Sequence, residues 1–141
     1  MPARLSVVDA EGFNFDEEVD GGGRPFLVAR GADGDLGILP GHEPVLTTLR
    51  PGPLQIRDGD NVTELFCGGG FLEVLPDRVT VLADVAERAD AISEEAAQAA
   101  RDRAAQRLQG ELTERERAEM SLALEVADAR LRMARIRRGI Q

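Results

Sequence analysis

The sequence predicts a mainly β protein with a helical end: an N-terminal antiparallel β-sandwich followed by a C-terminal antiparallel α-helical hairpin. The first observation is a change of composition near residue 86, because all seven prolines and 13 of the 15 glycines lie before it. The second is that the remainder is mostly Ala, Arg, Glu and Leu, which are strong helix formers. Gly and Pro instead punctuate short strands and turns. We therefore expect a β domain over residues 1–86 and a helical domain over residues 87–141.

Short apolar or alternating runs mark the expected strands, and turn residues such as Gly, Pro and Asp separate them. Alternation is clearest where Val79, Val81 and Ala83 share one face, and Leu82 on the other face suggests burial on both sides. Because no helical run of ten or more residues interrupts the strands, a parallel βαβ sheet is disfavoured. The expected strands are residues 5–8, 26–29, 36–39, 45–49, 54–56, 62–66, 71–75 and 79–82.

Two helices are expected in the second domain. Ser93 is a suitable N-cap for the first helix, which should end near Leu108, with Gly110 as its stop signal. Thr113 and Glu116 match a capping box at the start of the second. The second helix then shows a heptad-like seam, and alanines of the first helix have a similar spacing, so the two should pack as a thin, marginally stable hairpin. The seam residues are Met120, Leu124, Ala127, Leu131 and Ala134, facing Ala97, Ala100 and Ala104.

Charge and composition exclude several functions. The net charge is -9, and residues 1–86 carry the whole acidic excess, so nucleic-acid binding is not expected. Trp and Tyr are absent, which removes the usual platforms for stacking bases. The N-terminus lacks the apolar segment of a signal peptide, and no stretch is long and apolar enough to span a membrane. We expect membrane association only through a partner, and the single cysteine is compatible with a reducing compartment.

Candidate catalytic residues are few. His42 and Glu43, with Asp35 nearby in the sequence, could form an acid/base pair, but a second histidine is missing and we favour structural or interface roles. Cys67 stands before Gly68-Gly69-Gly70 and could be a nucleophile among backbone donors. Because no paired base is identifiable, a bulge or tight turn is the simpler interpretation. No catalytic residue is therefore assigned.

Cofactor and metal sites are also not expected. The glycine triplets do not open a helix and lack the lysine of a phosphate-binding loop, and the His, Cys and carboxylate positions show no ligand spacing. The acidic run 16–20 is interpreted as a solvated loop. The basic run Arg130, Arg132, Arg135, Arg137 and Arg138 leaves two explanations open: a favourable charge at a helix C-terminus, or a surface for an anionic partner.

Several motifs taken in order resemble the epsilon subunit of F-type, proton-translocating ATP synthases, whose mitochondrial counterpart is called delta. The stretch GDLGILPGHEPVLTTLRPG at residues 34–52 resembles the family's G-[DE]-[LF]-G-x-[LY]-P-G-H-x-P-[LV] motif. Residues 5–12, with the sequence LSVVDAEG, resemble the opening strand of the family. Residues 68–84, with the sequence GGGFLEVLPDRVTVLAD, resemble the second signature of the family. RDRAAQRL at residues 101–108 fits its first C-terminal helix.

The resemblance implies a sandwich of about ten strands, a docking role for residues 1–86 and a regulatory role for the hairpin. It implies a non-catalytic central-stalk subunit without a cofactor, which links the gamma subunit to the c-subunit ring at the cytoplasmic face of a bacterial plasma membrane. Pro40, Gly41 and His42 would then face gamma, and Gly34, Asp35 and Leu36 would face the c-ring. The hairpin could rise along gamma and restrain ATP hydrolysis, with Arg130, Arg132 and Arg135 meeting an acidic segment of the beta subunit.

The chain departs from the family pattern in two places. The segment 12–30 differs, so strand register there is not predicted. Some bacterial members bind ATP through an [IL]-D-x-x-R-A motif, and the matching stretch here begins at Ile92 but has Ser93 and Ala96 in place of Asp and Arg. Ile92 keeps the first position of the motif, and further on only Arg103 matches another ATP-contacting arginine. Because the charged Asp and Arg positions are lost, weak or absent nucleotide binding is predicted.

Two other classes of function remain as alternatives. One is a free-standing adaptor or regulatory module, built from a β-sandwich and a helical recognition hairpin. The other is a small hydrolase that uses His42 or Cys67. Co-purification with a membrane ATPase would separate the stalk subunit from both alternatives.

Overall fold

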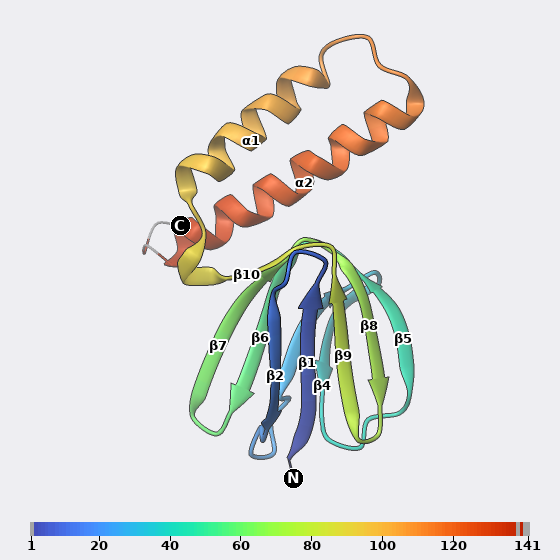
Figure 1. Cartoon of the computed structure of the whole chain (residues 1–141), viewed down its shortest axis with the longest axis vertical. Helices are drawn as coiled ribbons and strands as arrows, with labels where there is room; N and C mark the ends of the chain where they lie inside the picture. Colours follow the sequence, from blue (N-terminus) through green and yellow to red (C-terminus); the bar gives the residue numbers. More distant parts are fainter. Residues whose placement is uncertain (1, 138, 140–141) are drawn as a thin grey trace. The chain divides into compact units, whose positions relative to one another are not determined.

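The computed structural model describes residues 2–137 and 139, and the chain divides into two compact units, Met1–Arg88 and Ala89–Gln141. Ten strands in the first unit form one curved sheet that folds over a single core (Figure 1). The fold class expected from the sequence is confirmed. The strands are β1 (Ala3–Asp9), β2 (Asn14–Val19), β3 (Leu27–Gly31), β4 (Gly34–Ile38), β5 (Val45–Leu49), β6 (Gly52–Asp58), β7 (Asn61–Cys67), β8 (Gly70–Leu75), β9 (Arg78–Ala83) and β10 (Ala86–Arg88).

The sheet runs in the order β10-β7-β6-β3-β5-β8-β9-β1-β2, and β4 pairs with β3. The described strand pairs are antiparallel except for β1 and β9, which pair in parallel over Arg4–Asp9 and Arg78–Ala83. The expectation of a purely antiparallel sandwich is therefore wrong at this one place. Parallel neighbours cannot be joined by a short hairpin, and here almost the whole unit lies between them in the chain.

The core follows the two-residue period of the strands. In β1, Ala3, Leu5 and Val7 are buried, and in β8, Leu72 and Val74 are buried. Phe26 and Phe66 are among the largest fully buried side chains. Leu82 is 54% exposed. The expectation that β9 is buried on both faces is therefore wrong.

The acidic run 16–20 lies largely in β2 rather than in a solvated loop. Phe15 and Val19 of this strand are buried, whereas Glu17 between them is exposed. Arg4 on β1 donates a 2.9 Å hydrogen bond to Asp16, which lowers the pKa of that carboxyl group. The outer edge of β2 is thus charged, a common protection of edge strands against pairing with other chains. The sequence pattern does not reveal this strand, because only two of its six side chains are apolar and buried.

The glycine triplet 68–70 is not a hairpin turn, because β7 and β8 do not pair with each other. It carries the chain from one part of the sheet to another. A Cβ on Gly70 would lie 2.1 Å from the Leu82 carbonyl oxygen, and its φ is +139°. Close approach of two backbones therefore requires glycine at this position.

The helical unit consists of the 3₁₀ turn η1 (Ala89–Ala91), α1 (Glu94–Arg107) and α2 (Glu114–Arg137). The Ser93 hydroxyl accepts a hydrogen bond from the Ala96 amide at 3.1 Å, as expected of an N-cap. Thr113 and Glu116 exchange two hydrogen bonds of 3.1 Å, which confirms the capping box.

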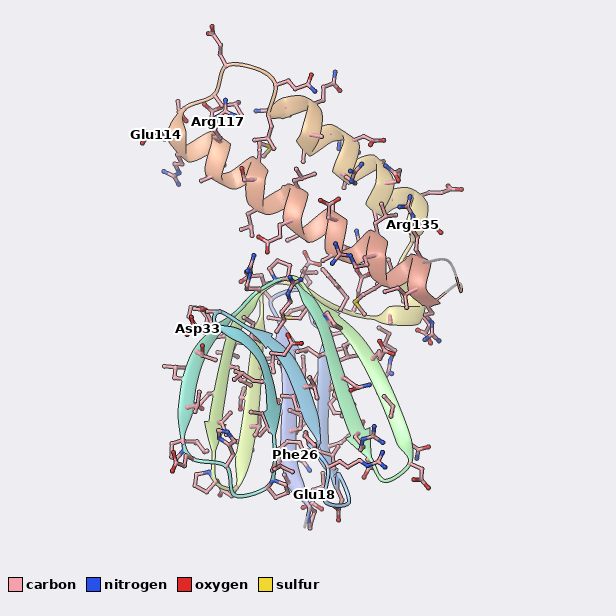
Figure 2. The ribbon with its side chains drawn as sticks, turned by 180° about the vertical axis from the view of Figure 1, so that it is seen from behind. Glu18, Phe26, Asp33, Glu114, Arg117 and Arg135 are labelled. Atoms are coloured by element: carbon pink, nitrogen blue, oxygen red, sulfur yellow. The ribbon has the colours of Figure 1, made fainter. Side chains whose placement is uncertain are left out.

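The end of α1 differs from the prediction, because Gly110 does not have the positive φ of a glycine cap. Instead, the Arg117 guanidinium of α2 donates hydrogen bonds to the carbonyl oxygens of Leu108 and Gly110 at 3.1 and 3.4 Å. Figure 2 shows Arg117 close to the start of α2. A cation satisfies carbonyls that the helix end leaves unpaired.

The two helices pack through the predicted seam. Ala97 and Ala104 of α1 are buried, and so are Ala127, Leu131 and Ala134 of α2. Met120 and Leu124 are half-buried. Arg101 and Asp128 form an ion pair across the seam, which adds a polar contact to a narrow apolar interface.

None of the described helices combines the length and the apolar character needed to cross a membrane.

Candidate functional site

The loop after β4 carries the histidine of the Gly/Pro-rich motif. Pro40 and Gly41 are the central residues of a β-turn closed by a 3.1 Å hydrogen bond from the His42 amide to the Leu39 carbonyl. Gly41 has a φ of +75°, and Pro followed by such a glycine is typical of a type II turn. The His42 Nδ1 donates to the Glu43 carbonyl at 2.7 Å, which holds the half-buried ring against the loop.

Gly34, Asp35 and Leu36 lie in the first half of β4, directly after the turn formed by Ala32 and Asp33. Asp35 is exposed and stands opposite Arg30 in the β3–β4 register, and Leu36 is partly buried against the core. The strand separates these residues from the 39–44 loop. Figure 2 shows Asp33 and Phe26 at opposite ends of this unit. The Phe26 amide donates a hydrogen bond to the Ile38 carbonyl, which directly precedes the 39–44 loop. The Gly34–Leu36 segment and the loop therefore lie toward opposite ends of the unit.

An exposed apolar face covers the outer side of three neighbouring strands, β5, β8 and β9. Leu46 is 72% exposed, and Phe71 and Leu75 of β8 are 51% and 40% exposed. Phe71 stands directly opposite Leu82 of β9, and Leu46 stands opposite Glu73. We call Leu46, Phe71, Leu75 and Leu82 the outer apolar face. The sequence alone does not reveal this face, because an apolar residue on either side of a strand equally indicates burial.

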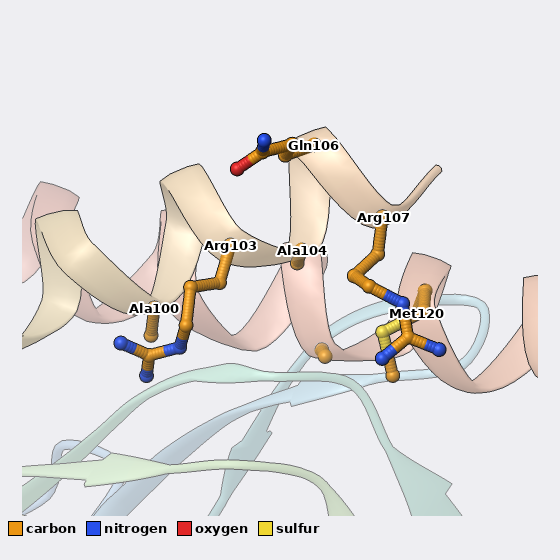
Figure 3. A pocket seen from close by; sticks show the side chains of 7 residues that line it. Ala100, Arg103, Ala104, Gln106, Arg107 and Met120 are labelled. Carbon is orange, nitrogen blue, oxygen red and sulfur yellow. The ribbon is translucent and has the colours of Figure 1, made fainter. Parts of the chain in front are cut away.

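The helical unit has two shallow grooves beside the seam. The first, about 530 Å³, is floored by Ala100, Ala104, Met120 and Ala123. Arg103, Gln106 and Arg107 of α1 also line it, and Figure 3 shows the long side chains of Arg103 and Arg107 extending over it. The second, about 870 Å³, is lined by Gln98, Arg101, Asp128, Leu131, Arg132, Arg135 and Ile136.

The three arginines expected to face one partner are not equivalent. Arg132 and Arg135 line the second groove, and Arg130 does not. Arg135 lies 3.4 Å from Glu94 and donates to Gln98 at 3.1 Å, so it is bound within the hairpin. Arg132 is exposed and forms no ion pair with the residues that the structure describes.

Ile92 and Arg103, the two residues expected to contact a nucleotide if one binds, line different hollows. Ile92 lines a separate hollow with Ala89, Asp90, Glu94, Ala134 and Arg137, near the start of α1. Arg103 lies about three helical turns further along and borders the first groove. Ser93, which stands where the motif has Asp, accepts the Ala96 amide as a helix cap.

The environment of Cys67 does not suit a nucleophile. The thiol is 1% exposed and donates to the Gly69 carbonyl at 3.3 Å. Burial raises its pKa to about 11, whereas reactive cysteines have a lowered pKa. Over residues 2–137 and 139, no group of three His, Cys, Asp or Glu side chains could hold a metal ion.

Comparison with known proteins identifies the family. The family model described as ATP synthase, Delta/Epsilon chain, beta-sandwich domain, matches residues 3–89. The chain is 44% identical over 131 residues to the ATP synthase epsilon chain of Desulforamulus reducens, covering 93% of this chain and 96% of that one. It is 43% identical over 142 residues to the ATP synthase epsilon chain of Herpetosiphon aurantiacus, covering all of both.

Solved structures agree in fold. A chain in the cryo-EM structure of the Euglena gracilis mitochondrial ATP synthase (OSCP/F1/c-ring) matches with a TM-score of 0.74 at 24% identity, covering 91% of this chain and 78% of that one. A chain in the Tetrahymena thermophila mitochondrial ATP synthase structure of the central stalk and c-ring matches with a TM-score of 0.66 at 16% identity, covering 94% and 96%. At these identities the likeness shows the fold alone, whereas the sequence matches show descent. The chain belongs to the family of ATP synthase epsilon chains.

Proposed function

We propose that this chain is a non-catalytic rotor subunit of a proton-driven ATP synthase, which docks on the gamma subunit and reaches the c-subunit ring through its β unit. The outer apolar face carries the proposal. Four exposed large apolar side chains on one face of three neighbouring strands, grouped around Glu73, indicate an interaction site. Membership of the epsilon chain family supports the synthase as the assembly in which that site is used.

The outer apolar face and the 39–44 loop form one continuous candidate surface for gamma. The loop ends where β5 begins, and Leu46 is the second residue of β5. Fully burying a large apolar side chain is worth about 1.5–3 kcal/mol, so covering four partly exposed ones can supply several kcal/mol of binding. The β-turn at Pro40 and Gly41 holds His42 at the rim of this surface.

The Gly34–Leu36 segment is the proposed contact with the c-ring. It lies at the other end of β4 from the 39–44 loop. A connector between two partners needs two separated surfaces on a rigid body, and β4, hydrogen-bonded to β3, supplies a short rigid spacer. The exposed Asp35 carboxylate is available to polar or basic groups of the ring. Through the complex, the subunit would sit peripherally at the cytoplasmic face of a bacterial plasma membrane.

The helical unit is the proposed regulatory part, in contact with the beta subunit when it restrains hydrolysis. Among the three arginines, Arg132 is the one that can meet an acidic segment without breaking the hairpin, since Arg135 is bound to Glu94 and Gln98. Ile136, which is 60% exposed in the same groove, offers an apolar contact beside it.

The gamma contact can be tested with charge insertions into the β unit. Phe71→Glu and Leu46→Glu should each weaken binding of the purified chain to gamma by about tenfold or more, because a carboxylate would be desolvated in an apolar contact. Val62→Glu is the matched control, because Val62 is also a strand residue, 42% exposed, but lies on β7 outside the face. Equal binding by all three variants in calorimetry would contradict docking through this face.

The division of labour can be tested by truncation. A fragment that ends at Arg88 keeps all ten strands and should retain gamma binding, because the proposed gamma surface lies on β5, β8, β9 and the 39–44 loop. For the ring, Asp35→Ala should weaken assembly only slightly, since one exposed charge pair contributes about 0.2–1 kcal/mol. Deleting residues 34–37 is not a clean test, because it removes most of β4 and the packed side chain of Leu36.

A free-standing adaptor remains the alternative function. Pull-down from solubilised membranes of the source cells should recover gamma and c subunits with the tagged chain. Recovery of an unrelated soluble partner instead would favour the adaptor.

A further inference from the structure

The Asp9 carboxylate joins two segments that are far apart in the sequence. Asp9 is the last residue of β1, and its Oδ1 accepts hydrogen bonds from the amides of Glu11 and Phe13 at 3.0 and 2.9 Å. Its Oδ2 accepts the amide of Ala86, 77 residues away, at 2.9 Å. The two oxygens thus have separate tasks, one in the β1–β2 turn and one on the first residue of β10. The hydrogen bonds from Ala86 and Phe13 lower the pKa of Asp9.

The segment that Asp9 holds is the last part of the β unit. The Val85 carbonyl accepts the Gly68 amide at 2.8 Å, and the Asp84 amide donates to the Gly69 carbonyl at 2.9 Å. β10 pairs with β7 through only three residues, with Ala86 opposite Cys67. A strand this short is weakly held by its own ladder, so a charged acceptor at its first amide is a substantial part of what keeps it in the sheet.

The helical unit begins directly after this strand. The 3₁₀ turn η1 is tied to α2, because Arg137 lies 3.8 Å from Asp90. η1 follows β10 directly in the chain, and Ile92 and Ser93 then lead into α1, as the trace from β10 to α1 in Figure 1 shows. The covalent joint between the units is therefore the Arg88–Ala89 peptide, with an anchored segment on each side.

We propose that Asp9 is a latch that fixes the point at which the helical unit leaves the β unit. With the latch closed, the joint is one peptide long. With the Ala86 bond broken, β10 can leave the sheet, and the joint becomes a flexible tether that includes the three residues Ala86–Arg88. The reach of a flexible chain grows with the square root of its length, so the helical unit would explore a wider range of positions. The inference concerns the isolated chain and does not depend on the proposed function.

Asp9→Asn is the most informative variant, because it keeps the hydrogen bonds in the β1–β2 turn and removes the hydrogen bond to Ala86. The asparagine Oδ1 can still accept the Glu11 and Phe13 amides, whereas its Nδ2 is a donor and cannot accept the Ala86 amide. Asp16→Asn is the matched control, since it also removes one negative charge next to β1 but leaves Ala86 untouched. If Asp9→Asn unfolds the β unit, Ala86→Pro provides a second route, because it removes the donor of the same bond.

Two measurements on the full chain test the latch. Hydrogen exchange of the Ala86 amide should accelerate about tenfold or more in Asp9→Asn, whereas the Glu11 and Phe13 amides should keep their protection. Spin labels at Asn61→Cys and Ser121→Cys, with Cys67→Ser, should report a broader distance distribution between the units in Asp9→Asn or Ala86→Pro than in the parent chain or Asp16→Asn. An unchanged distribution despite faster Ala86 exchange would overturn the proposal, as would equal broadening in the Asp16→Asn control.

Discussion

The guanidinium group of Arg135, in the last turn of α2, lies 3.4 Å from the carboxylate of Glu94, in the first turn of α1. The same side chain donates a second hydrogen bond to Gln98 at 3.1 Å. The two residues are 41 positions apart, and their contact closes the end of the hairpin at which α1 begins and α2 ends. Arg135, which the family resemblance places against the beta subunit, therefore also contributes to the closure of the hairpin.

Removing this contact should loosen the hairpin slightly. Both side chains are partly exposed, and exposed ion pairs contribute about 0.2–1 kcal/mol, so Arg135→Gln should lower the free energy of unfolding of the helical unit by that amount. Urea unfolding followed by far-UV circular dichroism, in a double-mutant cycle with Glu94→Gln, measures the coupling. Arg132→Gln is the control and should show no coupling to Glu94. A coupling energy of zero for the Arg135 pair would mean that water replaces it without loss.

The capping box should stabilise the start of α2. Thr113→Ala removes the oxygen that accepts the Glu116 amide, and loss of such a cap costs about 1 kcal/mol. Thr113→Ser keeps the hydroxyl and should retain most of the stability. Thermal unfolding of the three proteins provides the measurement, and equal stability of the Ala and Ser variants would show that the cap contributes nothing.

The same box should give the helical unit an acid-sensitive component of stability. Hydrogen bonds from the backbone and side chain of Thr113 lower the pKa of Glu116 from its usual 4.5. A carboxyl group with a lowered pKa in the folded state stabilises that state above its unfolded pKa, and the contribution disappears as the pH falls through the folded pKa. Stability measured from pH 7 downward should therefore fall more steeply in the parent chain than in Glu116→Gln, beginning near pH 4.5. Parallel curves would contradict this linkage.

Cys67 should be unreactive in the folded protein and should destabilise it in alkali. Burial raises the thiol pKa from 9.0 to about 11, so the folded state holds its proton where the unfolded state has released it. Stability is therefore unaffected below pH 9.0 and falls as the pH rises toward about 11. Cys67→Ala should lack this alkaline component. A thiol reagent at pH 8 should label the parent chain only upon unfolding, and rapid labelling of the native chain would show that the thiol is accessible.

ATP should bind the isolated chain weakly or not at all. Ser93 and Ala96 replace the charged positions of the nucleotide motif, and a hydrogen bond to a charged group is worth about 1.5–3 kcal/mol, so their loss should raise the dissociation constant by tens-fold or more. Calorimetry of the parent chain against Ser93→Asp/Ala96→Arg tests this, with Arg103→Gln to reveal any contribution from that side chain. Micromolar binding by the parent chain would contradict the prediction.

Much of the local structure could be predicted because it depends on neighbours in the chain. Ser93 caps α1, and Thr113 and Glu116 cap α2, through hydrogen bonds that span three residues. All eight expected strands lie in or overlap observed strands, since alternation and turn residues act locally. The strands that were missed, β2 and β10, are a charged edge strand and a three-residue strand, in which alternation is too weak or too short to detect.

What only the tertiary structure decided is which distant residues meet and which faces stay exposed. The sequence by itself determined two units, their element types and the family motif, because hydrophobic period, caps and turns are properties of a few adjacent residues. It could not determine the parallel pairing of β1 with β9, the exposure of Phe71 and Leu82, or the Asp9–Ala86 and Arg135–Glu94 contacts. These depend on how segments tens of residues apart pack over one core, and a short local pattern does not encode that arrangement.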